Sequence, residues 1–179
     1  MRTQSVTLGS ATFSAWMPMD SAKAVFGVGI GVTITPAAVL TYGVQHTFDD
    51  PYKRVNPISI TRSGTTVTVN QTDHGLSVGD FVHVEGANTG PTDVFDGNFT
   101  VAAITDANNF TYTVSSAGAT TALGTAMITT LRVRPNSILG SSSANGDTNY
   151  AFTVRAVRLN VSAWTSGKVT MTVNQGSGT

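Results

Sequence analysis

Hydrophobic residues alternate with small or polar ones along several short stretches of the chain. In residues 25–34, VFGVGIGVTI, every second residue from Phe26 to Ile34 is apolar, and the residues between them are mostly glycine. A period of two predicts a β-strand with one buried face. The glycine face indicates either the close approach of another group or a sharp bend over a small core. Residues 39–48, VLTYGVQHTF, predict a second strand, which ends at the proline-containing loop DDPYKRVNP.

The C-terminal stretch AFTVRAVRLNVSAW changes its apolar phase near Ala156 and Val157. A β-bulge at this point would add the one residue that keeps both halves of a strand on the core. Arg155 and Arg158 would then point away from the core on either side of the bulge. The tight turn TSG follows, and KVTMTVNQ alternates again. We therefore expect these two stretches to pair as a hairpin.

The middle of the chain, residues 57–129, predicts five or six short strands. ISITRSGTTVTVN predicts two strands joined by a turn at Ser63 and Gly64, and FVHVEG predicts one more. NFTVAAITDANNFTYTVS predicts a second hairpin, and AMITTLRV predicts a closing strand. Many short strands in about 70 residues are typical of a small barrel or sandwich. No stretch has the period of an amphipathic helix.

These patterns predict an all-β protein with two domains. The flanks, residues 1–56 and 130–179, are expected to form one discontinuous β-sandwich. Residues 57–129 are expected to form a small β-barrel or sandwich module inserted in one of its loops, where chain ends lie near each other and insertions are tolerated. A single continuous β-sandwich is the alternative.

Composition narrows the classes of function. Ten basic residues balance ten acidic ones, so the chain lacks the general positive charge that nucleic acids or anionic membranes attract. Charged residues make up only 11% of the chain, against roughly 25% in ordinary soluble domains. We expect copies of the protein or partner proteins to cover much of its surface, although a merely charge-poor soluble protein is the alternative. The absence of cysteine excludes disulfides, thiolate zinc sites and cysteine nucleophiles.

No stretch reaches the length of about 18 apolar residues that a membrane helix needs. The first residues, MRTQSVTLGSATFSAW, lack the apolar core of a signal peptide. We therefore expect the protein to fold in the cytoplasm where it is made.

Residues 73–88, DHGLSVGDFVHVEGAN, concentrate two histidines and three acidic residues. A zinc site would need His74 and His83 together with Asp73 or Asp80, but no standard ligand spacing is present. The same residues also fit a tight corner between two strands, and we prefer this interpretation. Metal and cofactor binding are therefore not expected.

A corner needs backbone freedom and local acceptors for backbone N–H groups. Gly75 and Gly79 supply the freedom, and Asp80 can accept from nearby amides. Asp49 and Asp50 beside His46 are a second candidate cluster, for which a loop cap is the simpler interpretation. The only glutamate is Glu85, and no P-loop, nucleotide fingerprint or nucleophile elbow is present. We do not expect an enzyme.

Two runs, HGLSVGDFVHVEGAN and FDGNFTVAAITDANNFTYTV, resemble a small β module found repeatedly in structural proteins of tailed bacteriophages. Similar modules are likened to the small β domain of ubiquitin-activating enzymes, which implies a fold and not that thioester activity, because this chain has no cysteine. YGVQHTFDDP and AVRLNVSAWTSGKVTMTVNQG in the flanks resemble short virion proteins of tailed phages. This resemblance implies a β-sandwich on the particle. The chain departs from that pattern by carrying the module after Asp49 and Asp50.

The resemblance implies a structural virion protein that decorates or cements the capsid. Its expected partners are the major capsid protein and copies of itself, as a dimer or trimer, with no nucleic acid, membrane or small-molecule substrate. It would be made in the host cytoplasm and lie on the capsid surface. Candidate contact residues are Trp16 and Trp164, because tryptophans are frequent anchors of interfaces, together with Arg155 and Arg158. The alternatives are a tail, neck or fibre component and a surface carbohydrate-binding module.

Overall fold

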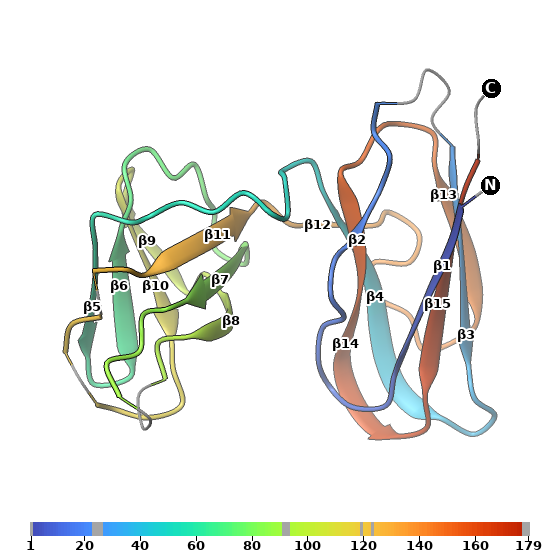
Figure 1. Cartoon of the computed structure of the whole chain (residues 1–179). Helices are drawn as coiled ribbons and strands as arrows, with labels where there is room; N and C mark the ends of the chain where they lie inside the picture. Colours follow the sequence, from blue (N-terminus) through green and yellow to red (C-terminus); the bar gives the residue numbers. More distant parts are fainter. Residues whose placement is uncertain (1, 23–26, 91–93, 119, 123, 177–179) are drawn as a thin grey trace. The chain divides into compact units, whose positions relative to one another are not determined.

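The computed structural model describes residues 2–22, 27–90, 94–118, 120–122 and 124–176. The protein is all-β, every strand pair is antiparallel, and the described residues contain no helix. The chain divides into two compact units (Figure 1). Met1–Asp50 and Arg134–Thr179 form the first, which we call the sandwich unit, and Pro51–Val133 form the second, which we call the module. The joins lie after Asp50 and Val133, whereas the sequence placed them after residues 56 and 129.

The sandwich unit consists of two four-stranded sheets. The first sheet has the strand order β1 (Arg2–Leu8), β15 (Val169–Gln175), β3 (Val28–Ile34) and β13 (Gly146–Tyr150). The second has the order β12 (Arg134–Pro135), β4 (Val39–Thr47), β14 (Ala156–Ser166) and β2 (Met17–Pro18). Both edges of the second sheet are therefore strands of two residues that end in proline.

The core of the sandwich unit comes from the alternating apolar residues of both sheets. Val28, Ile30 and Val32 of β3 are at most 2% exposed, and Val44 and Leu159 of the second sheet are fully buried. Burying one such side chain contributes about 1.5–3 kcal/mol. The strand predicted from residue 25 is β3, and residues 25 and 26 lie outside the described residues. The strand predicted at residues 39–48 is β4.

The predicted C-terminal hairpin is wrong. β14 and β15 are consecutive in the chain, but β14 pairs with β4 and β2, and β15 pairs with β1 and β3. The turn at Gly167 therefore carries the chain from one sheet to the other. Gly167 has a φ of +85°, and a Cβ there would collide with Ala38. Alternation shows that both strands have an apolar face. The same pattern arises when the strands pair in one sheet and when they lie in opposite sheets with their apolar faces in a shared core.

The predicted β-bulge at Ala156 and Val157 is also wrong. β14 begins at Ala156 and pairs one to one with β4 as far as Val161, and the register shifts lie later, at Val161/Ala163 and Trp164/Ser166. The apolar phase changes because residues 151–155, just before Ala156, are outside any strand. The strand alternation therefore has no defect at the point where the sequence suggested one.

The module contains two further antiparallel sheets, and neither closes into a barrel. Their buried side chains share one core, which includes Phe95, Phe110 and Tyr112. The first sheet has the order β5 (Ser59–Ser63), β6 (Thr66–Asn70), β10 (Asn109–Thr113) and β9 (Ala103–Asp106). The second has the order β11 (Met127–Leu131), β7 (Phe81–Glu85) and β8 (Gly97–Thr100).

The first predicted hairpin of the module is confirmed, because β5 and β6 pair across a turn in which Gly64 has a φ of +58°. Ser63 ends β5 and pairs with Thr66. The second predicted hairpin is only partly right. β9 and β10 pair, but the residues before β9 form β8, which pairs with β7 in the other sheet. The chain changes sheets at Val101, whose N–H donates to the carbonyl oxygen of Asp80 at 2.8 Å.

Candidate interaction surfaces

His74 belongs to the corner that precedes β7 in the module. Its Nδ1 accepts a hydrogen bond from the backbone N–H of Leu76 at 3.0 Å, so the ring proton is on Nε2, which donates to the carbonyl oxygen of Asp106 at 3.0 Å. The imidazole also meets the ring of Phe110 edge-on, with centroids 5.2 Å apart. Nδ1 therefore fixes the backbone within the corner, and Nε2 holds the corner against the β9–β10 hairpin.

Asp80 closes the same corner. The residue is 6% exposed, and its Oδ2 accepts from the N–H of Ser77 at 2.8 Å. Its Oδ1 accepts from the N–H of Val133, the last residue of the module, at 2.8 Å. Gly75 and Gly79 have φ values of +61° and +92°, which favour glycine. The carboxylate thus connects the beginning of β7 with the end of the module.

His83 lies on the face of β7 that points away from the core. Its Nδ1 is 2.8 Å from the Oδ1 of Asn98, and its Nε2 is 3.7 Å from a carboxylate oxygen of Glu85. Within the part of the chain that the structure describes, no group of three or more His, Cys, Asp and Glu residues could hold a metal ion. The same residues include no helix long and apolar enough to span a membrane.

An aromatic cluster lies in the sandwich unit at the end where the chain leaves for the module. The ring of His46 meets those of Phe48, Tyr150 and Phe152 at centroid distances of 4.9–5.8 Å. Phe48 and Phe152 are each 51% exposed, whereas His46 is 7% exposed. The Tyr150 hydroxyl is 3.0 Å from the Nδ1 of His46. Burial, and secondly the positive charge of Arg134, lower the pKa of His46 below its usual value. The cluster was not predicted from the sequence, because its members lie in two distant segments.

Arg155 lies at the end of the loop that carries Phe152, immediately before β14. Its guanidinium is 3.6 Å from a carboxylate oxygen of Asp50 and donates to the hydroxyl of Ser21 at 3.3 Å. Its backbone N–H donates to the carbonyl oxygen of Thr47. The side chain is exposed and points away from the core, as the sequence predicted. In the loop after β4, the hydroxyl of Thr47 accepts from the backbone N–H of Asp49 at 3.1 Å, so the cap comes from Thr47 and not from the Asp49 carboxylate.

Arg158 is buried, although the sequence suggested a side chain that points outward. It is 3% exposed, its Nε donates to Gln45 at 2.8 Å, and its guanidinium lies over the rings of Phe13 and Trp16. Burial lowers its pKa to about 9, so the side chain stays charged at neutral pH. The residue points away from the core, but residues 13–16 run beside β14 and cover it. Arg158 and Trp16 therefore hold the N-terminal segment onto the second sheet.

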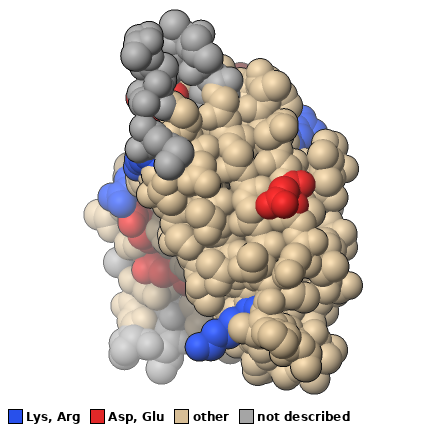
Figure 2. Space-filling model, turned by 90° about the vertical axis from the view of Figure 1, so that its right-hand side faces the viewer, with Lys and Arg blue, Asp and Glu red and all other residues tan. Residues whose placement is uncertain are grey.

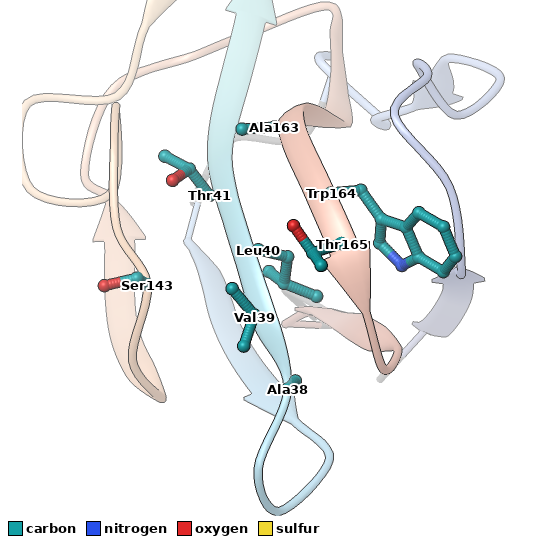
Figure 3. Close-up of a pocket in the computed structure, with 8 residues that line it drawn as sticks. All are labelled: Ala38, Val39, Leu40, Thr41, Ser143, Ala163, Trp164 and Thr165. Atoms are coloured by element: carbon teal, nitrogen blue, oxygen red, sulfur yellow. The ribbon is translucent and has the colours of Figure 1, made fainter.

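Trp164 is the most exposed of the tryptophans and lines a shallow pocket of about 390 Å³ (Figure 3). It is 42% exposed, and its Nε1 donates to the carbonyl oxygen of Gly167 at 3.0 Å. The pocket is formed by Ala38, Val39, Leu40, Thr41, Ser143, Ala163, Trp164 and Thr165. Apolar side chains and hydroxyl groups are mixed on its walls.

The outer face of the first sheet is nearly free of charge, and we call it the threonine face. Figure 2 shows it as a broad area in which Lys, Arg, Asp and Glu are scarce. The register places its residues in three rows across the sheet. The rows are Thr7–Thr170–Thr33, Ser5–Thr172–Gly31–Asp147 and Thr3–Asn174–Gly29–Asn149.

Hydrogen bonds between neighbouring strands order the side chains of the threonine face. The hydroxyl of Thr3 donates to Asn174 at 2.7 Å, and the hydroxyls of Thr7 and Thr170 are 2.8 Å apart. Asp147 is the only charged residue in the three rows. The sequence contains a signal for this face, because every second position is Thr or Ser in RTQSVTL and Thr or Asn in VTMTVNQ.

No family model matches the chain, and a search of the curated proteins finds no match either.

Proposed function

We propose that the protein is a structural virion protein of a tailed bacteriophage, and that it decorates or cements the capsid by binding the major capsid protein. The threonine face is the observation that carries this proposal. A partner that covers it removes almost no charge from water, and stripping water from unpaired ions is a large cost of forming a protein interface. The glycine backbone in two of its rows also allows close approach.

The resemblance of the module and the flanks to phage structural proteins supplies the class of partner. A cementing protein needs a broad contact surface rather than a reactive site, and the threonine face extends over all four strands of one sheet. The protein would be made in the host cytoplasm and reside on the capsid surface. We propose no catalytic activity, cofactor, nucleic-acid or membrane binding, or small-molecule substrate.

The proposal is tested by adding purified protein to capsids that were assembled without it and measuring bound and free protein after sedimentation. Binding should saturate in proportion to the number of capsid subunits. Thr172→Lys, at the centre of the threonine face, should abolish saturation because it buries a charge in the contact. Thr68→Lys is the matched control, since Thr68 is equally half-buried on a central strand of the module. Equal binding by both variants, or none by the unmodified protein, would refute the proposal.

A tail, neck or fibre component is the alternative within the same class, and a few copies per virion would favour it. Carbohydrate binding is a second candidate function, and the pocket beside Trp164 favours it. The indole of Trp164 is exposed and can stack on a sugar ring, and the hydroxyl groups of Thr41, Ser143 and Thr165 also line the pocket and can form hydrogen bonds with a ligand. Trp164→Ala would then remove binding to cell-surface polysaccharide without affecting capsid binding.

A further inference from the structure

β1 forms one edge of the sheet that carries the threonine face. Among the described residues only β15 pairs with it, one to one over seven residues from Arg2↔Gln175 to Leu8↔Val169. Alternate backbone N–H and C=O groups of an edge strand point outward and can pair with another chain. The strand is regular along its whole length, so it presents a continuous row of such groups.

The other edges of the sandwich unit carry features that block strand addition, and β1 does not. β2 contains Pro18 and β12 contains Pro135, and proline cannot donate to a ladder. β13 carries Asp147 in its interior. β1 has no proline and no bulge, and its single charged residue, Arg2, is at its end. Natural proteins usually protect a long, regular edge by one of these devices.

We propose that β1 pairs antiparallel with β1 of a second copy, about a two-fold axis at Ser5, so that the two first sheets become one continuous sheet. This inference does not rest on the proposed capsid function, because such a dimer would form in solution with or without capsids. Because this two-fold pairing occupies the β1 edge of both copies, the assembly is closed and forms a dimer rather than a longer chain of subunits.

The sequence of β1 is complementary to itself in this register. On the threonine face, Ser5 would meet Ser5 of the second copy, and Thr3 would meet Thr7 of the second copy, which continues the hydroxyl rows across the axis. On the core side, Val6 would meet Gln4 of the second copy, and Leu8 would meet the aliphatic stem of Arg2. Like charges directly opposite each other destabilise a cross-strand pair, and this register places no like charges opposite each other.

The dimer would also cover apolar surface that the single chain leaves half-exposed. Val6 and Leu8 pack against the core of the sandwich unit but remain partly accessible at its edge. A second copy of β1 beside them would bury more of both side chains. The favourable terms are therefore backbone hydrogen bonds along seven residues and additional apolar contact on one face.

The test measures the mass of the full chain in solution over a series of concentrations. The unmodified protein should approach twice the 18.6 kDa mass of one chain. Ser5→Lys and Ser5→Glu should each remain monomeric, because each places two like charges directly opposite at the axis. An equimolar mixture of the two variants should recover the doubled mass, because unlike charges then meet. Asn149→Lys is the matched control on the opposite edge of the same face and should dimerise like the unmodified protein.

Several outcomes would overturn the inference. These are a monomer at every concentration, a trimer or larger ring, variants at Ser5 that dimerise normally, and loss of the dimer in Asn149→Lys. If the Ser5 variants misfold, hydrogen exchange of the unmodified protein at several concentrations tests whether β1 pairs with a second copy. The amides of β1, unlike those of β13, should become more protected as concentration rises. Protection of β1 that requires capsids would instead identify a capsid strand as its partner and would also refute self-pairing.

Discussion

Replacing Asp80 with asparagine should destabilise the module while leaving the sandwich unit intact. The carboxylate accepts two backbone hydrogen bonds, from Ser77 and from Val133, both at 2.8 Å, and it is 6% exposed. An asparagine in the same position has one acceptor oxygen, so its NH₂ group would face one of the two N–H donors. The corner would then lose one bond completely and keep the other only as a neutral hydrogen bond.

The expected loss of stability follows from the free energies of hydrogen bonds to charged groups and of buried donors without an acceptor. A hydrogen bond to a charged group contributes about 1.5–3 kcal/mol, and a buried donor left without an acceptor costs about 1–3 kcal/mol. We therefore expect a loss of about 3 kcal/mol for the module. Because each 1.4 kcal/mol is a factor of ten in an equilibrium constant, this corresponds to amide exchange roughly a hundredfold faster.

Hydrogen exchange measured by mass spectrometry separates the two units. In Asp80→Asn, peptides from β7 and β11 should exchange faster, and peptides from β4 and β14 should exchange at the unmodified rate. Asp73→Asn is the matched control, because it makes the same chemical change at an exposed aspartate of the same corner. Equal effects of the two substitutions, or equally faster exchange in both units, would show that Asp80 does not close the corner as described.

Three further predictions concern the sandwich unit. In a urea titration, Gly43→Ala should lower the free energy of unfolding by about 2 kcal/mol, because the added Cβ would collide with the carbonyl oxygen of Gly140. Gly29→Ala is the control and should be nearly neutral, because its Cβ would lie 4.0 Å from the nearest atom. His46→Gln should flatten the loss of stability as the pH falls through the ordinary histidine pKa of about 6.5, because the unfolded chain takes up a proton there while the folded pKa is lower. An unchanged slope of urea midpoint against pH would contradict this. Arg158→Ala should cost about 2 kcal/mol through two lost cation–π contacts and lost packing, and a thermal melt no lower than that of Arg155→Ala would contradict it.

Local sequence patterns predicted the positions of the strands better than they predicted which strands pair. The alternation in β3 identified a strand with one buried face and a glycine face, because every second residue along it is apolar. The same signal in β14 and β15 was assigned to a hairpin, although the two strands lie in different sheets. Alternation shows only that one face of a strand is buried. Two consecutive strands with this pattern can pair in one sheet as a hairpin, or they can lie in two sheets whose buried faces pack against each other.

The candidate surfaces show a similar division. Gly79 and Asp80 could be identified as corner residues, because glycine and aspartate have local roles that the sequence displays. The burial of Arg158 could not be anticipated, since the rings that cover it come from residues 13–16, far away in the sequence. The threonine face was visible as alternating hydroxyl residues, but only the register aligns them into rows.

The location and copy number of the protein on purified virions test the central proposal most directly. Electron cryomicroscopy of particles with and without the protein would provide both. The account predicts additional density repeated over the capsid lattice, with the threonine face against the capsid, and a copy number that follows the number of capsid subunits. Density restricted to the tail, the neck or a fibre, or particles identical with and without the protein, would contradict it.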